Sequence, residues 1–196
     1  GVGGEADPAW AMGRPRWFPR QFDWVVGCSY EGLPTSAAPI RNLMGCNMAF
    51  RRSVIDEAGG FYAGLGRTGN DGHGCSETEF CIRAQSLLGG RFVFEPRARI
   101  HHRVPAERGT VRYFLSRCRA EGRSKARLAG RTGTGKALEL ERRYVRRTLT
   151  VGVLRGLRDV IRRDPAGAAR SAAILAGAAS ASGSYVAGSL SRRAGP

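Results

Sequence analysis

Residues 74–84 read GCSETEFCIRA, and this stretch carries the clearest local structural signal in the sequence. Ser76, followed three residues later by Glu79, fits a capping box, in which the two side chains satisfy backbone N–H groups at the start of a helix. Apolar residues from Phe80 onward recur at helical spacing. We therefore predict a helix over about residues 76–88, which a glycine pair ends.

Outward from this helix, the sequence predicts a mixture of strands and helices. Strands are expected where β-branched and aromatic residues cluster, and helices where apolar residues recur three or four positions apart. The expected strands are 22–30, 43–51, and 91–95 with 97–102 beyond Pro96. The expected helices are a short one from Ser53, one from Val111 to about 129, and a helical region 137–190 that breaks at Asp164-Pro165. Loops are expected at 1–21, 31–41 and 130–136.

The composition is that of a globular chain. Its 196 residues are 42% hydrophobic and 24% charged, which suits one ordinary domain with a core and excludes wholesale disorder. The five cysteines form no C-x-x-C pair, so neither a disulfide framework nor a ribbon-type zinc site is indicated. A reducing compartment, and hence a cytoplasmic location, is the resulting expectation.

The net charge of +16 is distributed unevenly. Residues 1–110 hold 13 basic and 11 acidic residues, whereas residues 111–196 hold 19 basic and 5 acidic residues. Such an excess permits anionic partners of several kinds, namely nucleic acid, nucleotides or an acidic membrane surface. No helix-turn-helix, zinc-finger or RNA-recognition signature accompanies the charge, so we expect no specific nucleic-acid partner.

Aliphatic and basic residues alternate in the C-terminal region. Val151, Leu154, Leu157 and Ile161 lie beside four arginines, which is a basic amphipathic pattern compatible with docking on a membrane surface. A helix that packs on its own domain gives the same pattern, and the sequence leaves both alternatives open. The sequence contains no run of about 18 consecutive apolar residues, the length that would predict a membrane span.

Four groups of residues could carry chemistry. Glu77 would occupy the first turn of the predicted helix, after a glycine-rich stretch, where an ionised carboxylate is favoured and could serve as a base. Acidic residues also suit first helical turns for structural reasons alone. His101 and His102 end a predicted strand and would face opposite sides. Residues 130–136, GRTGTGK, imitate a phosphate-binding loop, but Ala137 replaces its Ser or Thr. The spacing of His73, Cys75 and Cys81 matches no common zinc pattern.

A series of ordered segments is similar to a known enzyme family. The segments are WFPRQFDWVVGCSYEGLP (17–34), RNLMGCNMAFRR (41–52), GGF (59–61), GCSETEFCIRA (74–84), FEPRARIHHRVP (94–105) and RYFLSRCRAEGRSKA (112–126). Together they resemble the C-terminal, acceptor-side half of actinobacterial family 2 glycosyltransferases of the GT-A fold. The resemblance implies an α/β fold, namely a partial GT-A (nucleotide-diphospho-sugar transferase) fold with a mixed sheet and flanking helices, plus a basic helical C-terminal tail.

The resemblance also assigns roles to individual residues. It makes Glu77 the general base and places Ser76 where the family commonly has a carboxylate. It implies that acceptor or substrate binding involves Asn47, Arg51, Glu79 and Arg83. It further implies that the metal and diphosphate lie near His102, with His101 as the alternative because strand register cannot be fixed from one sequence.

The implied reaction is inverting transfer of a sugar from a nucleotide-sugar donor to a hydroxyl of a glycan or lipid-linked acceptor, with a divalent metal (Mg or Mn). Residues 1–130 would be the acceptor-side part of the catalytic domain, and residues 131–196 a basic helical tail at the inner face of the cell membrane. The family's nucleotide-binding half and its Asp-x-Asp motif have no counterpart here, so we expect the chain to be inactive alone. The alternative is a basic nucleic-acid-binding or membrane-surface-binding module without catalysis.

Overall fold

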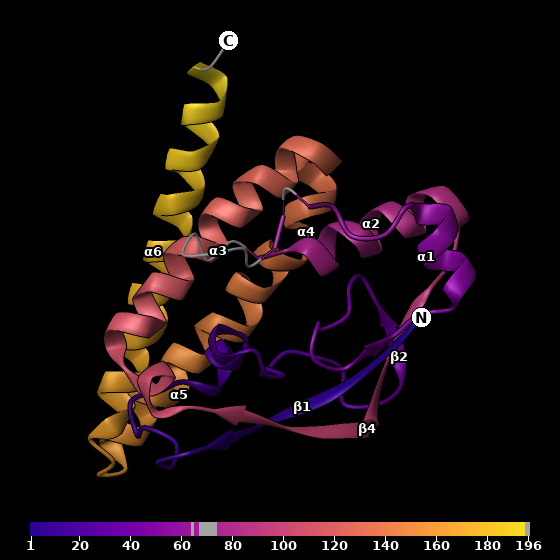
Figure 1. The fold of residues 1–196 in the computed structure, drawn as a ribbon. Helices are drawn as coiled ribbons and strands as arrows, with labels where there is room; N and C mark the ends of the chain where they lie inside the picture. The colour runs from indigo at the N-terminus through magenta and orange to yellow at the C-terminus, as the bar shows by residue number, and fades with distance from the viewer. Residues whose placement is uncertain (64, 67–73, 195–196) are drawn as a thin grey trace.

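The computed structural model describes residues 1–63, 65–66 and 74–194 (Figure 1). It is a mixed α/β structure in which a four-stranded mixed sheet is flanked by helices, as the sequence predicts. Its strands are β1 (Val2–Trp10), β2 (Ala38–Ile40), β3 (Met48–Ala49) and β4 (Phe92–Val104). Its α-helices are α1 (Arg52–Ala58), α2 (Ser76–Leu88), α3 (Val111–Thr132), α4 (Thr134–Tyr144), α5 (Thr150–Ile161) and α6 (Ala166–Ala194). The described residues also form the 3-10 helices η1 (Arg20–Val26) and η3 (Ala106–Gly109) and a π-helical turn, η4 (Val145–Leu149).

The long strands β1 and β4 form the centre of the sheet. The strand order is β2-β4-β1-β3; β1 and β4 are parallel, and the two short strands are antiparallel to their neighbours. The predicted loop over residues 1–21 is therefore wrong for its first half. Glycine-rich residues 2–10 form a strand because they pair with β4, about ninety residues away, and local composition carries no sign of that partner.

Three other predicted segments also differ from the structure. Residues 22–30 do not form a strand. Their apolar side chains reach the core from the 3-10 helix η1, which ends at Gly27 with a φ of 89°. Residues 43–51 contribute only the two-residue strand β3. The predicted loop 130–136 is mostly helical, since α3 continues to Thr132 and α4 begins at Thr134. A short apolar run cannot be assigned to strand or helix by periodicity alone.

Several predictions are confirmed. The helix over 76–88 is α2, the short helix from Ser53 is α1, and Val111 begins α3. The interrupted strand pair at 91–102 is a single strand, β4, with a register shift near Pro96. The break at Asp164-Pro165 separates α5 from α6. These signals survive because each depends on residues close together in sequence.

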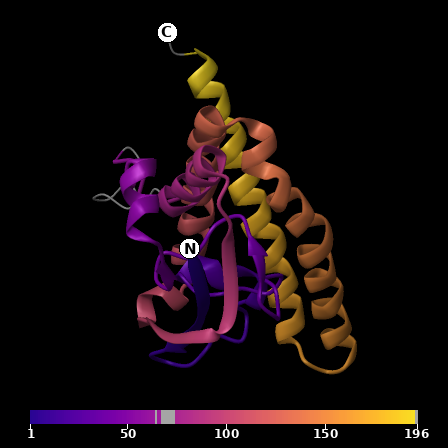
Figure 2. The same cartoon turned by 90° about the vertical axis from the view of Figure 1, so that its right-hand side faces the viewer.

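Helix α6 packs between α3 and α5 (Figure 2). Its contacts with both neighbours depend on glycine. A Cβ added at Gly122 of α3 would overlap the carbonyl oxygen of Ala181, and one at Gly156 of α5 would lie 2.6 Å from the carbonyl oxygen of Gly167. The main core joins these helices to the sheet and the 3-10 helix η1 through Phe18, Phe22, Val25, Val26, Cys28, Val104, Phe114, Cys118, Leu149 and Ile174.

The contact at Gly122 can be tested by comparing two glycines in helices. We expect Gly122→Ala to lower the free energy of unfolding by about 1–3 kcal/mol, because the added methyl group has to push α6 away. Gly183 in α6 has no neighbour within 4 Å of an added Cβ, so Gly183→Ala should raise the free energy of unfolding by about 0.5–1 kcal/mol. Urea unfolding followed by circular dichroism measures both, and equal effects of the two variants would contradict the close α3–α6 contact.

Candidate active site

Glu77 lies in the first turn of α2 and is half-buried. Its Oε2 accepts a hydrogen bond from the Ser76 hydroxyl at 3.1 Å. A Cβ placed on Gly45 would lie 3.8 Å from Glu77 Oε1, so the loop 41–47 passes beside the carboxylate. The partial positive charge of the helix N-terminus favours the ionised form at this position. The structure therefore presents a carboxylate between the start of α2 and a neighbouring loop.

The predicted capping box at the start of α2 is wrong. The residue at the N-cap is Cys75, which has a φ of 71° and makes no side-chain capping hydrogen bond. Glu79 is instead 2% exposed and forms a two-pronged ion pair with Arg83 of the same helix, at 2.9 and 3.0 Å. A carboxylate held in this way cannot reach back to the backbone at the helix start. The two-pronged ion pair with Arg83, one turn later, therefore replaces the capping hydrogen bond.

Glu79 and Arg83 are brought together as one buried unit. Arg83 also donates to the carbonyl oxygens of Ala58 and Gly60, so the pair fixes the end of α1 against α2. Arg131 of α3 approaches Glu79 at 3.8 Å. The predicted role of Glu79 and Arg83 in acceptor binding stays a prediction, while the contacts in the structure are those of an internal brace. Arg51 is exposed at the N-cap of α1.

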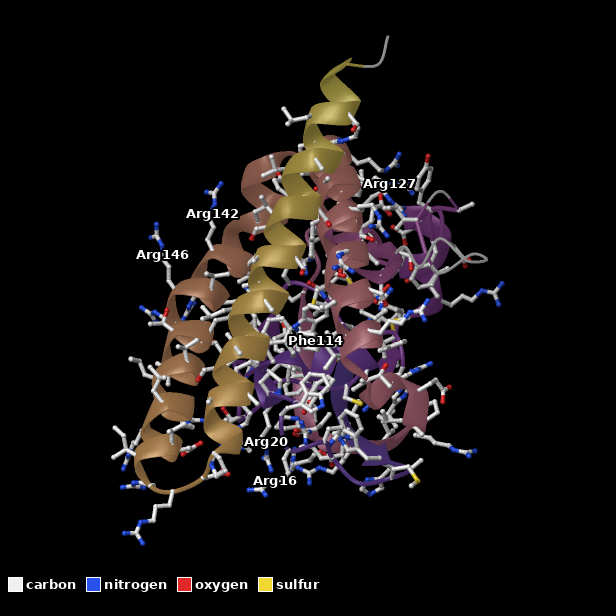
Figure 3. All side chains as sticks on the ribbon, turned by 90° about the vertical axis from the view of Figure 1, so that its left-hand side faces the viewer. Arg16, Arg20, Phe114, Arg127, Arg142 and Arg146 are labelled. Carbon is white, nitrogen blue, oxygen red and sulfur yellow. The ribbon has the colours of Figure 1, made fainter. Side chains whose placement is uncertain are left out.

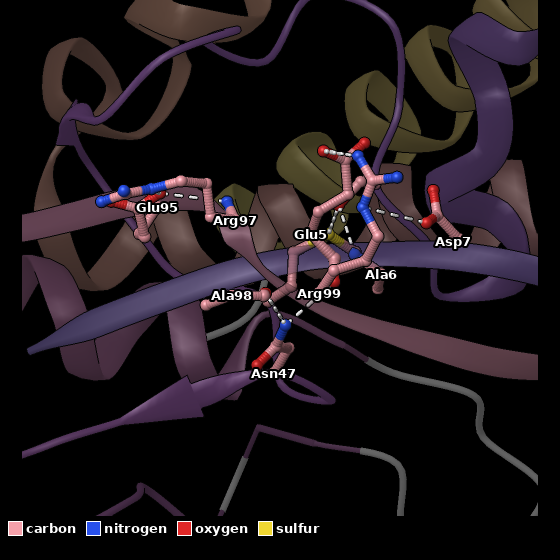
Figure 4. Close-up of polar contacts among 10 residues, drawn as sticks. Glu5, Ala6, Asp7, Asn47, Glu95, Arg97, Ala98 and Arg99 are labelled. Atoms are coloured by element: carbon pink, nitrogen blue, oxygen red, sulfur yellow. Dashed lines mark hydrogen bonds and ion pairs between the residues drawn. The ribbon is translucent and has the colours of Figure 1, made fainter.

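Asn47 bridges the two central strands where their register shifts (Figure 4). Gly4 pairs with Glu95 but Glu5 pairs with Arg99, so residues 96–98 bulge out of β4. The Asn47 side-chain amide donates to the carbonyl oxygens of Glu5 and Ala98, at 2.9 and 2.7 Å. This amide closes the opening that the bulge creates and ties the loop 41–47 to the sheet.

Beside the bulge, β1 carries two carboxylates that sequence reasoning missed, because residues 1–21 were expected to be a loop. Glu5 and Asp7 alternate along the strand and so share one face. Arg99 of β4 lies between them, with its guanidinium nitrogens 3.6 Å from Glu5 Oε2 and 3.3 Å from Asp7 Oδ2 (Figure 4). Glu95 and Arg97 form a separate exposed pair at 2.9 Å. The grouping of Glu5, Asp7 and Arg99 depends on the β1–β4 pairing.

His102 is the better placed of the two histidines that end β4. His101 is exposed, whereas His102 is half-buried and a Cβ on Gly27 would lie 3.2 Å from its Nε2. Cys46 lies 3.3 Å from the carbonyl oxygen of that same Gly27. The loop 41–47 therefore has Glu77 beside Gly45 at one point and the Gly27–His102 contact beside Cys46 at the next. The role of either histidine toward a diphosphate stays a prediction.

The divalent metal that the resemblance implies stays a prediction. Within the described part of the chain, no three His, Cys, Asp or Glu side chains lie close enough together to hold a metal ion. His73, which the sequence placed near Cys75 and Cys81, lies outside the described residues.

A part-buried ion network supports the start of α2, and sequence reasoning did not predict it. Glu141 of α4 accepts two hydrogen bonds from Arg41, at 3.0 and 2.8 Å, and pairs with Lys125 of α3 at 2.6 Å. Lys125 also lies 3.5 Å from Glu121, whose carboxylate contacts the Cys75 thiol at 3.6 Å. The network therefore connects the loop 41–47 and the residue before α2 to helices α3 and α4.

Glu141 is ionised in this network at neutral pH. Burial alone would raise the pKa of Glu141, but the charges of Lys125 and Arg41 outweigh it and hold that pKa at about 2. Burial also raises the pKa of the Cys75 thiol far above its usual value, so the thiol stays protonated. These groups position the backbone around Glu77 and are not poised to exchange protons near neutral pH.

Two recorded surface pockets lie away from Glu77. One is bounded by β2, Gln85 and the start of β4, and the other lies between residues 14–31 and the α5–α6 hairpin. The second is rich in arginine, but Arg14, Arg16, Arg155 and Arg170 in it are each paired with a carboxylate. Neither pocket includes a predicted catalytic residue.

The chain is similar to a curated glycosyltransferase. It is 33% identical over 124 residues to the glucosyl-dolichyl phosphate glucuronosyltransferase of Haloferax volcanii, a match that covers 63% of this chain and 40% of that protein. The chain thus spans about two fifths of the length of this curated relative. No family model and no solved structure match the chain. The relative is a glycosyltransferase, as the resemblance implies, but it is not actinobacterial, so the actinobacterial type stays a prediction.

The bridging role of Asn47 makes a stability prediction. We expect Asn47→Ala to lower the free energy of unfolding by about 1–2 kcal/mol, because the carbonyl oxygens of Glu5 and Ala98 lose their donor. Asn47→Asp keeps the size of the side chain but turns an acceptor toward two acceptors, so its loss should be larger. Urea unfolding measures both, and an Asn47→Asp variant as stable as the parent would contradict the bridge.

The Glu141 network makes a pH prediction. Because the pKa of about 2 lies below the ordinary glutamate value of 4.5, the stabilisation is present above about pH 5 and is lost as the pH falls toward 2. We expect Glu141→Gln to lower the free energy of unfolding at pH 7 by about 2–3 kcal/mol. The difference from the parent should shrink at pH 3. Glu57→Gln, on the exposed part of α1, is the control, and a pH-independent effect of Glu141→Gln would contradict the network.

Proposed function

We propose that this chain is the acceptor-side part of an inverting, nucleotide-sugar-dependent glycosyltransferase of the family 2 type, in which Glu77 is the general base. The observation that carries the proposal is the 33% identity, over 124 residues, to a glucuronosyltransferase. The placement of Glu77 supports it independently, since the carboxylate is half-buried at a helix start and borders a loop that the sheet holds in place.

In the proposed reaction, Glu77 takes the proton from an acceptor hydroxyl while the hydroxyl oxygen attacks the anomeric carbon of the donor sugar. The bond between that carbon and the diphosphate oxygen breaks, and the nucleoside diphosphate leaves with the bonding electron pair. One such displacement inverts the configuration at the anomeric carbon. A positioned base of this kind contributes about 10²–10⁴-fold to the rate.

The contacts of Glu77 distinguish its two carboxylate oxygens as candidates for accepting the proton. Ser76 donates to Oε2 and holds the side chain in one orientation, while Oε1 lies beside Gly45. We take Oε1 as the proton acceptor, with Gly45 leaving room for the approaching hydroxyl because it has no side chain. Asn47 holds the same loop on the sheet, so it acts as a positioning residue in this proposal.

The acceptor class is part of the proposal. The printed name of the Haloferax relative gives it a dolichyl phosphate-linked substrate. We propose by analogy that the acceptor here is lipid-linked, that the protein works at the cytoplasmic face of a membrane, and that residues missing from this chain supply the donor site. The isolated chain would then show no turnover.

Glu77→Gln tests the proposal in the complete protein that contains this chain. The amide cannot accept the proton, so kcat should fall by about 10²–10⁴-fold, while the KM for the nucleotide sugar should change little because the side chain does not hold the donor. Glu107→Gln, on the exposed 3-10 helix η3, is the matched control and should keep the parent kcat. A Glu77→Gln enzyme with the parent kcat would eliminate Glu77 as the base.

A further inference from the structure

Helix α5 packs on the molecule with its smallest residues. Gly152 and Gly156 are buried, and Cβ atoms added there would lie 2.9 Å from the side chain of Ile174 and 2.6 Å from the carbonyl oxygen of Gly167, respectively. Both partners belong to α6. The face of α5 that meets the rest of the fold is therefore its glycine face.

The large aliphatic side chains of α5 lie on the opposite side. At about 100° per residue, Leu154 and Ile161 fall within roughly 20° of one another and far from the two glycines. They are 61% and 83% exposed, and Val151 and Leu157 beside them are each 51% exposed. A surface helix ordinarily buries its aliphatic stripe against the core. Helix α5 instead turns most of this stripe toward the solvent.

Unpaired positive charge surrounds this aliphatic face. Eight exposed arginines lie between residues 142 and 163. Among the described residues, seven of them form no ion pair: Arg142, Arg143, Arg146, Arg147, Arg158, Arg162 and Arg163. Arg155 is the one that binds a carboxylate, that of Glu31 at 2.6 Å. Arg142 and Arg146 point away from α6 in Figure 3. The surface thus combines exposed aliphatic groups with available cations.

We propose that this face, formed by the exposed aliphatic and arginine side chains of residues 142–163, binds an anionic lipid surface. Aliphatic side chains enter the boundary between headgroups and acyl chains, while the arginines bind the lipid phosphates. No helix among the described residues has the length and apolarity needed to cross a bilayer, and none is required, since the helix lies in the plane of the interface. The proposal does not depend on which carboxylate performs the chemistry.

Two other occupants fit the surface less well. In a symmetric pair of copies, the same arginine-rich patch would face itself, and the like charges would oppose association. Nucleic acid would accept the arginines, because phosphate contacts dominate its affinity, but it gives no reason to expose Leu154 and Ile161 at the centre of the patch. A lipid surface uses both kinds of side chain at once.

Vesicle flotation of the complete protein tests the proposal. The vesicles are phosphatidylcholine with about one third phosphatidylglycerol, and a second set contains phosphatidylcholine alone. We expect the parent to float with the anionic set and Leu154→Gln/Ile161→Gln to partition about ten-fold more weakly or worse. Arg158→Gln/Arg162→Gln should cost about five-fold per arginine, and raising the ionic strength to about 0.5 M should weaken flotation of the parent.

The matched control is Met12→Gln/Leu87→Gln, which removes two apolar side chains that are 82% and 63% exposed elsewhere. It should float like the parent, as should Glu77→Gln, so failure of docking and failure of the catalytic proposal are separable. A parent that does not float, or equal flotation of the α5 variant and the control, overturns the proposal. Dimerisation lost only in the α5 variant, or duplex-DNA binding indifferent to Leu154 and Ile161, would assign the face to those partners instead.

Discussion

Close contact between helix backbones at glycine is the constraint on which the rest of the structure depends. Gly122 lets α3 touch α6, and Gly156 with Gly167 does the same for α5 and α6. Because α6 lies between its two neighbours, a side chain at either contact would change the position of the whole helical layer. Phe114 and Ile174 of this layer share the main core with Phe22 of η1 and Val104 of β4, so the position of the layer also determines what lies beside the strands.

The position of α3 also affects the candidate site, because side chains of α3 contact the segments around Glu77. Lys125 and Glu121 lie on α3 and reach Glu141, Cys75 and, through Glu141, Arg41. The loop 41–47 and the start of α2 are therefore held from the helical side by charges, and from the sheet side by the amide of Asn47. Glu77 lies between these two attachments, and its own side chain accepts a hydrogen bond from Ser76.

Sequence reasoning reached the parts of this arrangement that are local. The helix after the glycine-rich stretch, the position of Glu77 in its first turn and the break at Asp164-Pro165 each follow from residues within a few positions of one another. The strand β1, the bulge that Asn47 closes and the Lys125 network depend on partners about forty to one hundred residues away. A capping box is a local rule too, yet it failed because Arg83 offers Glu79 a buried ion pair.

The same glycines that let α5 pack closely also determine what it exposes. The side of α5 that faces α6 carries Gly152 and Gly156, so on this side α5 contributes backbone rather than side chains to the contact. Val151, Leu154, Leu157 and Ile161 then lie on the outward part and are exposed, whereas Val153 is partly buried against the main core. Replacing the glycines by aliphatic residues would bury the stripe in the usual way, at the expense of the close contact with α6. The exposed aliphatic face is thus tied to the packing of the core, and the proposed lipid-binding surface is a consequence of the way in which α5 packs on α6.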